Sequence, residues 1–126
     1  ALGLLFVPIS DKELEGFPAP GDPAPGLYAL DIETGAQRWV YTRPSRCERT
    51  ECVFGLSAAV TATNDVVVIG SMDGMLEVLD AHSGAVVWSH DAWREYAAVN
   101  DVATHGGAFD AHGAFLADDL LLVVAG

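Results

Sequence analysis

Short apolar runs separated by tight turns dominate the chain, and the clearest series covers residues 66–91. The run 66–71 (VVVIGS) is rich in β-branched residues, long enough for a strand and too short for a helix. Asp73-Gly74 is a typical hairpin turn, so residues 76–80 (LEVLD) are predicted as the next strand. The turn 81–84 (AHSG) then leads into a third strand that begins at Val86. The pattern predicts a β-meander.

This meander repeats a pattern found earlier in the chain. Residues 27–42 (LYALDIETGAQRWVYT) align with residues 76–91 (LEVLDAHSGAVVWSHD) at an offset of 49 residues. The shared leucine, aspartate, glycine and tryptophan positions are Leu27, Leu30, Asp31, Gly35 and Trp39, and Leu76, Leu79, Asp80, Gly84 and Trp88. A repeat made only of strands and turns is typical of propeller blades, although two unrelated hairpins with similar turns are an alternative. We therefore predict an all-β fold, a partial β-propeller with about two to three four-stranded antiparallel blades.

The repeat divides the chain into three predicted segments. Residues 1–56 would form strands B to D of a partial blade, residues 57–91 a complete blade, and residues 92–126 a long loop with the first two strands of a further blade. Tight turns at 33–35, 64–65, 82–84 and 118–119 would lie on one face, and the long connections 10–26, 43–56 and 92–112 on the other. Long loops on one face of a rigid scaffold are where binding sites are built.

The repeat also carries a resemblance to a known family. Residues 29–39 (ALDIETGAQRW) resemble the Ala-x-Asp-x-x-Thr-Gly-x-x-x-Trp tryptophan-docking repeat of quinoprotein (PQQ) β-propellers, and the second copy has Val78 and Ser83 at the Ala and Thr positions. Residues 57–107, with SAAVTA, GSMDGMLEVLD, Val99-Asn100 and Gly106-Gly107, are similar to the polyvinyl-alcohol dehydrogenase branch. The resemblance implies that each tryptophan of the repeat packs against a neighbouring blade. The aspartates and glycines of the repeat, Asp31, Gly35, Asp80 and Gly84, are assigned to structural turns.

The same resemblance implies a cofactor, PQQ, held with a divalent cation that is usually Ca²⁺, and an aspartate that acts as base toward an alcohol. Carboxylate and amide oxygens suit such a cation, so Asn100 and Asp101 are the candidate metal ligands. Asn100, Gly106 and Gly107 are the candidate cofactor contacts, because glycines let the backbone approach a ligand closely. Asp101 and Asp110 are the candidate catalytic residues.

The same loop also departs from the pattern of that branch. Asp101 stands where the branch has a glycine, and Ala108 stands where it has a serine. The alternative interpretation is a solvated loop in which Asn and Asp side chains cap turns. In that case His105 and His112 are ordinary surface residues.

The two cysteines, Cys47 and Cys52, lie in one connection with four residues between them. We predict a local disulfide of the kind that forms in an oxidising compartment, with two reduced thiols as the alternative. No second pair of cysteines or histidines at suitable spacing accompanies them, which argues against a zinc site.

Charge and hydropathy exclude several partners. Six basic against eighteen acidic residues give a formal net charge of −12, which would repel nucleic acid and anionic membranes. No apolar run has transmembrane length, so no membrane insertion is expected. Since the chain opens and stops within predicted strands, we expect it to be a fragment of a longer propeller that is inactive alone and prone to self-association.

The family resemblance implies the function of the parent protein. It would be a periplasmic or extracellular PQQ-dependent alcohol dehydrogenase whose partners are its remaining blades and a cytochrome c electron acceptor. The alternative is a non-catalytic propeller of PQQ-like repeats that serves as a binding or assembly scaffold, because one fold hosts many functions.

Overall fold

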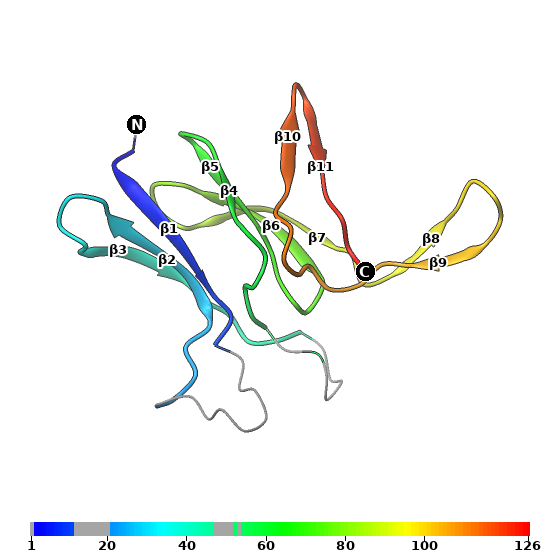
Figure 1. Cartoon of the computed structure of the whole chain (residues 1–126), viewed down its shortest axis with the longest axis horizontal. Coiled ribbons are helices and arrows are strands. Elements are labelled where there is room, and N and C mark those ends of the chain that lie inside the picture. The colour runs from blue at the N-terminus through cyan, green and yellow to red at the C-terminus, as the bar shows by residue number, and fades with distance from the viewer. Residues whose placement is uncertain (1, 12–20, 47–51, 53) are drawn as a thin grey trace.

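The computed structural model describes residues 2–11, 21–46, 52 and 54–126 (Figure 1). This part of the chain is all-β, as predicted, and contains strands and turns without a helix. The first sheet has the order β1 (Leu4–Ile9), β2 (Gly26–Asp31) and β3 (Gln37–Tyr41). The second has the order β4 (Thr61–Ala62), β5 (Val66–Gly70), β6 (Met75–Asp80) and β7 (Val86–Asp91). Two hairpins follow, β8 (Glu95–Ala97) with β9 (Ala103–His105), and β10 (Phe115–Ala117) with β11 (Leu120–Leu122).

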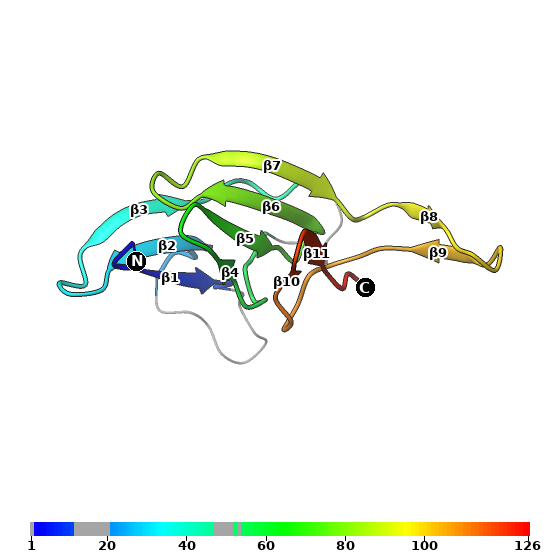
Figure 2. The same cartoon turned by 90° about the horizontal axis from the view of Figure 1, so that it is seen from above.

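All neighbouring strands pair antiparallel, and the second sheet is the four-stranded meander that the repeat predicts. Its first strand is shorter than the pattern suggests, because only residues 61–62 of the apolar run 57–62 pair with β5. The stretch 92–112, predicted as a long loop, differs more. It contains the hairpin β8–β9, which projects away from the sheets in both views (Figures 1 and 2).

The two repeat turns have the same geometry, which explains their shared sequence. In the first turn, the Oδ1 atom of Asp31 accepts the amide of Thr34 at 2.9 Å, and in the second the Oδ1 atom of Asp80 accepts the amide of Ser83 at 2.8 Å. These amide and hydroxyl donors hold the pKa of both carboxyls below the usual range. The glycine that closes each turn has a φ of +71° or +73°, a region that side chains with a Cβ rarely adopt.

The sheets lie next to one another (Figures 1 and 2), and apolar side chains pack between them. One core cluster lies between the first and second sheets, with Leu27, Phe54, Leu56, Val67, Ile69, Leu79 and Ala81. A second cluster joins the second sheet to β10–β11, with Ala58, Val68, Leu76, Ala92 and Phe109. The stack of antiparallel sheets is a partial β-propeller.

The first tryptophan of the repeat, Trp39, connects the two sheets. Its indole Nε1 donates to the carbonyl of Ala81 at 3.2 Å, and its ring lies directly over Gly84. A Cβ at Gly84 would sit only 2.7 Å from the ring atom Cε3. The second tryptophan, Trp88, is 48% exposed and stacks on His90 at 5.9 Å between ring centroids.

Candidate functional site

The tight turn at residues 71–74, between β5 and β6, is the point where the long connections meet. The amide of Met72 donates to the carbonyl of Gly55 at 2.9 Å, and the amide of Phe109 donates to the carbonyl of Ser71 at 3.1 Å. The first connection begins beside Gly55, because a Cβ at Gly55 would lie 3.0 Å from the carbonyl oxygen of Ser10. The described parts of all three long connections therefore gather at one end of the sheets, which we call the connection end.

A glycine at position 74 is required for this convergence. Its φ is +81°, and a Cβ there would lie 3.1 Å from the Cβ of Trp93 and 3.2 Å from the carbonyl oxygen of Gly107. The carbonyl of Gly74 also accepts the amide of Ala92 at 2.9 Å. The dipeptide Asp73-Gly74 thus does more than reverse the chain, since Gly74 also lets the connection 92–112 approach the turn closely.

A buried ion cluster lies on one side of this turn. The Arg43 guanidinium, at the end of the first sheet, donates from Nη1 and Nη2 to the two carboxylate oxygens of Asp73, at 2.6 and 3.0 Å. Its Nε donates to Glu77 at 3.3 Å, and Nη2 also donates to the hydroxyl of Ser71 at 3.2 Å. The guanidinium lies over the ring of Phe54 at 4.6 Å. Bidentate pairs of this kind fix geometry as well as charge.

Burial makes the charged groups of the cluster depend on one another. The side chain of Asp73 is fully buried and that of Glu77 is 5% exposed, so both carboxylates depend on Arg43 for compensation. Burial alone would raise the pKa of Asp73, but the hydrogen bonds from Arg43 and Ser71 outweigh it and the pKa is lowered. Tyr41 donates its hydroxyl to Glu77 at 2.7 Å, and burial together with this contact raises the pKa of that phenol.

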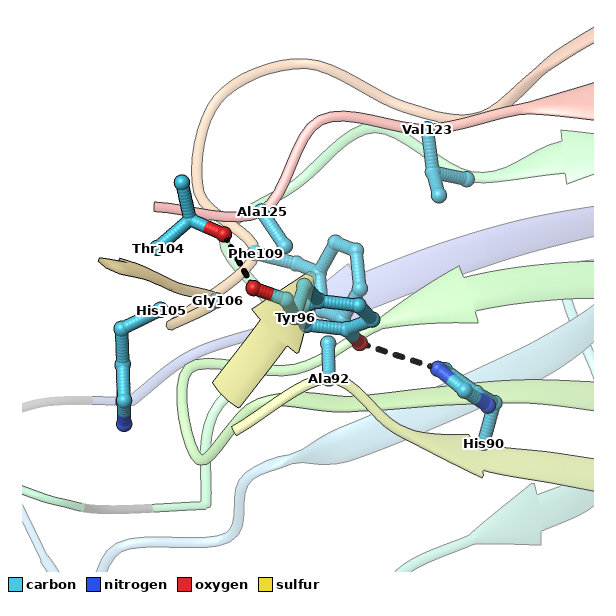
Figure 3. A pocket seen from close by; sticks show the side chains of 9 residues that line it. All are labelled: His90, Ala92, Tyr96, Thr104, His105, Gly106, Phe109, Val123 and Ala125. Atoms are coloured by element: carbon cyan, nitrogen blue, oxygen red, sulfur yellow. Dashed lines mark hydrogen bonds between the residues drawn. The ribbon is translucent and has the colours of Figure 1, made fainter. Parts of the chain in front are cut away.

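A pocket of about 430 Å³ lies on the other side of the turn, between the end of β7 and the base of the β8–β9 hairpin (Figure 3). Its lining residues are His90, Ala92, Tyr96, Thr104, His105, Gly106, Phe109, Val123 and Ala125. The Tyr96 hydroxyl and His90 Nε2 are 3.1 Å apart, and the Thr104 hydroxyl donates to the carbonyl of Tyr96 at 2.7 Å. A second apolar hollow of about 480 Å³ shares His90 and Val123 with this pocket.

The pocket and the ion cluster occupy equivalent places in the repeat. At the offset of 49 residues, Tyr41 corresponds to His90 and Arg43 corresponds to Ala92. The first sheet therefore places a guanidinium where the second places a methyl group. This small side chain contributes to the open space that the pocket occupies.

The residues proposed from the sequence for cofactor, metal and catalysis lie in three different places. Asn100 and Asp101 are exposed in the turn between β8 and β9, and Asp101 has a φ of +56°. Gly106 and Gly107 are buried at the base of the hairpin, where Gly106 lines the pocket. Asp110 accepts hydrogen bonds from the Ser57 hydroxyl and from the Ala111 amide. The structure does not bring the polar candidates together, and their roles stay predictions.

The described residues also lack one common kind of metal-binding cluster. Among them, no three or more His, Cys, Asp or Glu side chains lie close enough together to hold a metal ion. The roles of Asn100 and Asp101 as Ca²⁺ ligands stay predictions, and we derive no chemical step through the ion. Of the two cysteines, Cys52 is buried and is not a free thiol. Cys47 lies outside the described residues, so the pairing of the two stays a prediction.

Sequence reasoning missed Arg43 and Glu77. Glu77 is a charged residue at the centre of the apolar strand β6, and a buried charge at such a position requires a partner. That signal was available in the run LEVLD. The identity of the partner was not, because Arg43 precedes Glu77 by 34 residues and belongs to another sheet.

Comparison with known proteins identifies the family of the chain. The family model described as outer membrane protein assembly factor BamB, a model of PQQ repeats, matches residues 18–118. The chain belongs to this PQQ-repeat family. The match includes both copies of the aspartate-to-tryptophan repeat and the whole of the second sheet.

Relatives with curated names lie among dehydrogenases. The chain is 35% identical over 106 residues to a polyvinylalcohol dehydrogenase of Pseudomonas sp, an alignment that covers 81% of this chain and 17% of the relative. It is 27% identical over 107 residues to a polyvinylalcohol dehydrogenase of Sphingopyxis sp. (strain 113P3), covering 81% and 16%. Quinohemoprotein alcohol dehydrogenase ADH IIB of Pseudomonas putida is 33% identical over 66 residues, covering 50% and 9%. The chain thus spans under a fifth of the length of these relatives.

A solved structure shares the fold. The crystal structure of BamB from Moraxella catarrhalis matches with a TM-score of 0.52 and 24% identity, over 79% of this chain and 28% of that one. This likeness concerns the fold alone. Within the described residues, no helix is both long and apolar enough to span a membrane.

Proposed function

We propose that the chain forms part of the connection end of a PQQ-dependent alcohol dehydrogenase whose substrates are secondary or polymeric alcohols. The observation that carries the proposal is the alignment with a polyvinylalcohol dehydrogenase over 81% of the chain. The convergence of the long connections beside a pocket lined by His90, Tyr96 and Thr104 supports it, since imidazole and hydroxyl groups can bind an alcohol oxygen.

In such an enzyme, bound PQQ accepts the two electrons that leave the alcohol. Because the described residues contain no cluster of three or more His, Cys, Asp or Glu side chains close enough together to hold a metal ion, we propose that PQQ and Ca²⁺ are held mainly by other parts of the parent polypeptide. The role of this chain is then to position the connections and to shape one wall of the site. We further propose that the parent protein lies in the periplasm and passes electrons to a cytochrome c, as the name of one relative, 1-butanol dehydrogenase (cytochrome c) of Thauera butanivorans, suggests.

The test uses the full-length polypeptide that contains this chain. The purified protein is incubated with PQQ and Ca²⁺, and reduction of an artificial dye is followed with polyvinyl alcohol and with a short secondary alcohol. We expect dye reduction that requires both PQQ and alcohol, and that a calcium chelator abolishes. Cytochrome c then replaces the dye to test the proposed acceptor.

A second candidate function is a non-catalytic scaffold. It is favoured by the description of the matching family as an outer membrane protein assembly factor, and by the β8–β9 hairpin, whose strand residues are all exposed. This candidate predicts no PQQ-dependent dye reduction. It predicts instead that deletion of the gene lowers the amount of folded outer membrane protein, and that a copy with residues 96–104 replaced by a short glycine-serine turn does not restore it.

A further inference from the structure

The Ser71–Gly74 turn is held on two opposite sides by different parts of the chain. On the first side, Arg43 grips the turn through both carboxylate oxygens of Asp73 and through the hydroxyl of Ser71. The Ser71 hydroxyl in turn donates its one proton to Asp73 at 2.6 Å, and its oxygen lies 3.1 Å from the carbonyl oxygen of Met75. Since the Asp73 side chain is fully buried, it has little freedom to exchange these partners for water.

On the second side, the backbone of the same turn carries the wall of the pocket. The carbonyl of Ser71 accepts the amide of Phe109, and the carbonyl of Gly74 accepts the amide of Ala92. Phe109 and Ala92 both line the pocket (Figure 3). The Phe109 ring also packs against the backbone before the turn, because a Cβ at Gly70 would lie 2.5 Å from the Phe109 Cβ. The side chains of Ser71 and Asp73 thus contact Arg43, while the carbonyls of Ser71 and Gly74 hold two residues of the pocket wall.

We infer that Arg43 is a positioning residue for this pocket, although it does not touch it. The first sheet, through Arg43, fixes the conformation of the Ser71–Gly74 turn, and the turn fixes the positions of Phe109 and Ala92. This link is specific to one place in the repeat, because the residue equivalent to Arg43 in the second copy is Ala92 itself. The inference goes beyond the proposed redox function and holds whichever ligand the pocket takes.

Hydrogen exchange of the full-length protein, measured by mass spectrometry, tests this link without any assay of activity. The variant is Arg43→Gln, and the matched control is Arg38→Gln, which removes an exposed arginine 3.6 Å from Asp31. Peptides covering residues 90–95 and 106–112 report on the amides of Ala92 and Phe109. A peptide covering residues 79–86 reports on the amides of Ala81 and Gly84 at the opposite end of the same sheet.

In Arg43→Gln we expect the first two peptides to exchange about tenfold faster, because the turn that accepts their amides opens more often. The reference peptide should be unchanged, and Arg38→Gln should leave all three as in the unmodified protein. Faster exchange everywhere would show a general stabilising role and overturn the inference, as would unchanged exchange at residues 106–112. If Arg43→Gln does not fold, Arg43→Lys keeps the charge without the fork, and the same selectivity is expected with a smaller factor.

Discussion

Docking of Trp39 on the second sheet can be tested at two glycines that share a backbone conformation. Gly35 and Gly84 close the two repeat turns with φ values of +71° and +73°. A Cβ at Gly35 would meet no atom within 4 Å, whereas a Cβ at Gly84 would lie 2.7 Å from the Trp39 ring atom Cε3. The pair therefore separates backbone strain, which both substitutions cause, from the clash with the ring, which only one causes.

The expected magnitudes follow from these two contributions. Placing an alanine in the left-handed region costs roughly 1–2 kcal/mol in either turn. At Gly84 the new methyl group must also displace the Trp39 ring and its hydrogen bond to Ala81, and overpacking of this kind costs about 1–3 kcal/mol more. We therefore expect Gly84→Ala to be less stable than Gly35→Ala by about 1–3 kcal/mol.

The assay is urea unfolding of the 126-residue chain, followed by tryptophan fluorescence. The urea midpoints of the unmodified chain, Gly35→Ala and Gly84→Ala are compared. The slope of the unfolding free energy against urea should be the same for all three, because an unchanged slope means that the same surface is exposed on unfolding. Equal destabilisation by the two alanines would mean that the Trp39 ring does not lie over Gly84, and the account of how the sheets are joined would be wrong.

Three further predictions concern stability. Trp39→Ala should lower the unfolding free energy of the 126-residue chain by roughly 3–5 kcal/mol. Trp88→Ala should lower it by only about 1 kcal/mol, because Trp88 is half exposed. Similar shifts of the melting temperature for both variants would contradict this. Tyr41→Phe should cost about 1–3 kcal/mol in urea unfolding, since buried Glu77 loses a donor, and a neutral result would refute that hydrogen bond. The pKa of Asp73 in the folded protein lies below its unfolded value of 3.8. The ionised carboxylate therefore stabilises the fold above pH 3.8, and this stabilisation is lost as the pH falls through the folded pKa. Asp73→Asn should reduce the loss of stability in acid, and an unchanged dependence of stability on pH would count against the ion pair.

The architecture was predictable because its signals are local and repeated. The aspartate of each turn accepts amides two and three residues ahead, and the glycine that follows closes the turn, so five residues specify the geometry. The apolar run of β5 and the spacing of Trp39 from its turn then gave the meander and its repetition. Antiparallel neighbours joined by short turns leave few other arrangements.

The site was less predictable because its contacts join distant residues. Asn100, Asp101 and Gly106 were grouped because they lie in one predicted loop and follow the pattern of the dehydrogenase branch. Strands β8 and β9 pair as a hairpin, however, and place Asn100 and Asp101 in the turn at its tip. The alternation in 95–105 is weak and short, which hid the hairpin. Conversely, the sequence indicated that Asp73 is an ordinary turn residue, and only the fold reveals that it pairs with Arg43 at the interface between the two sheets.

The ion cluster distinguishes two interfaces that the repeat would otherwise make alike. If the second sheet were to stack on a neighbour that offers alanine in place of Arg43, both Asp73 and Glu77 would be enclosed as uncompensated anions, a large electrostatic penalty. Mispaired stacking of look-alike units is a characteristic error of repetitive chains during folding. The Arg43 guanidinium therefore favours the native neighbour of the second sheet, because only that neighbour compensates the two carboxylates and any other order of blades leaves them unpaired.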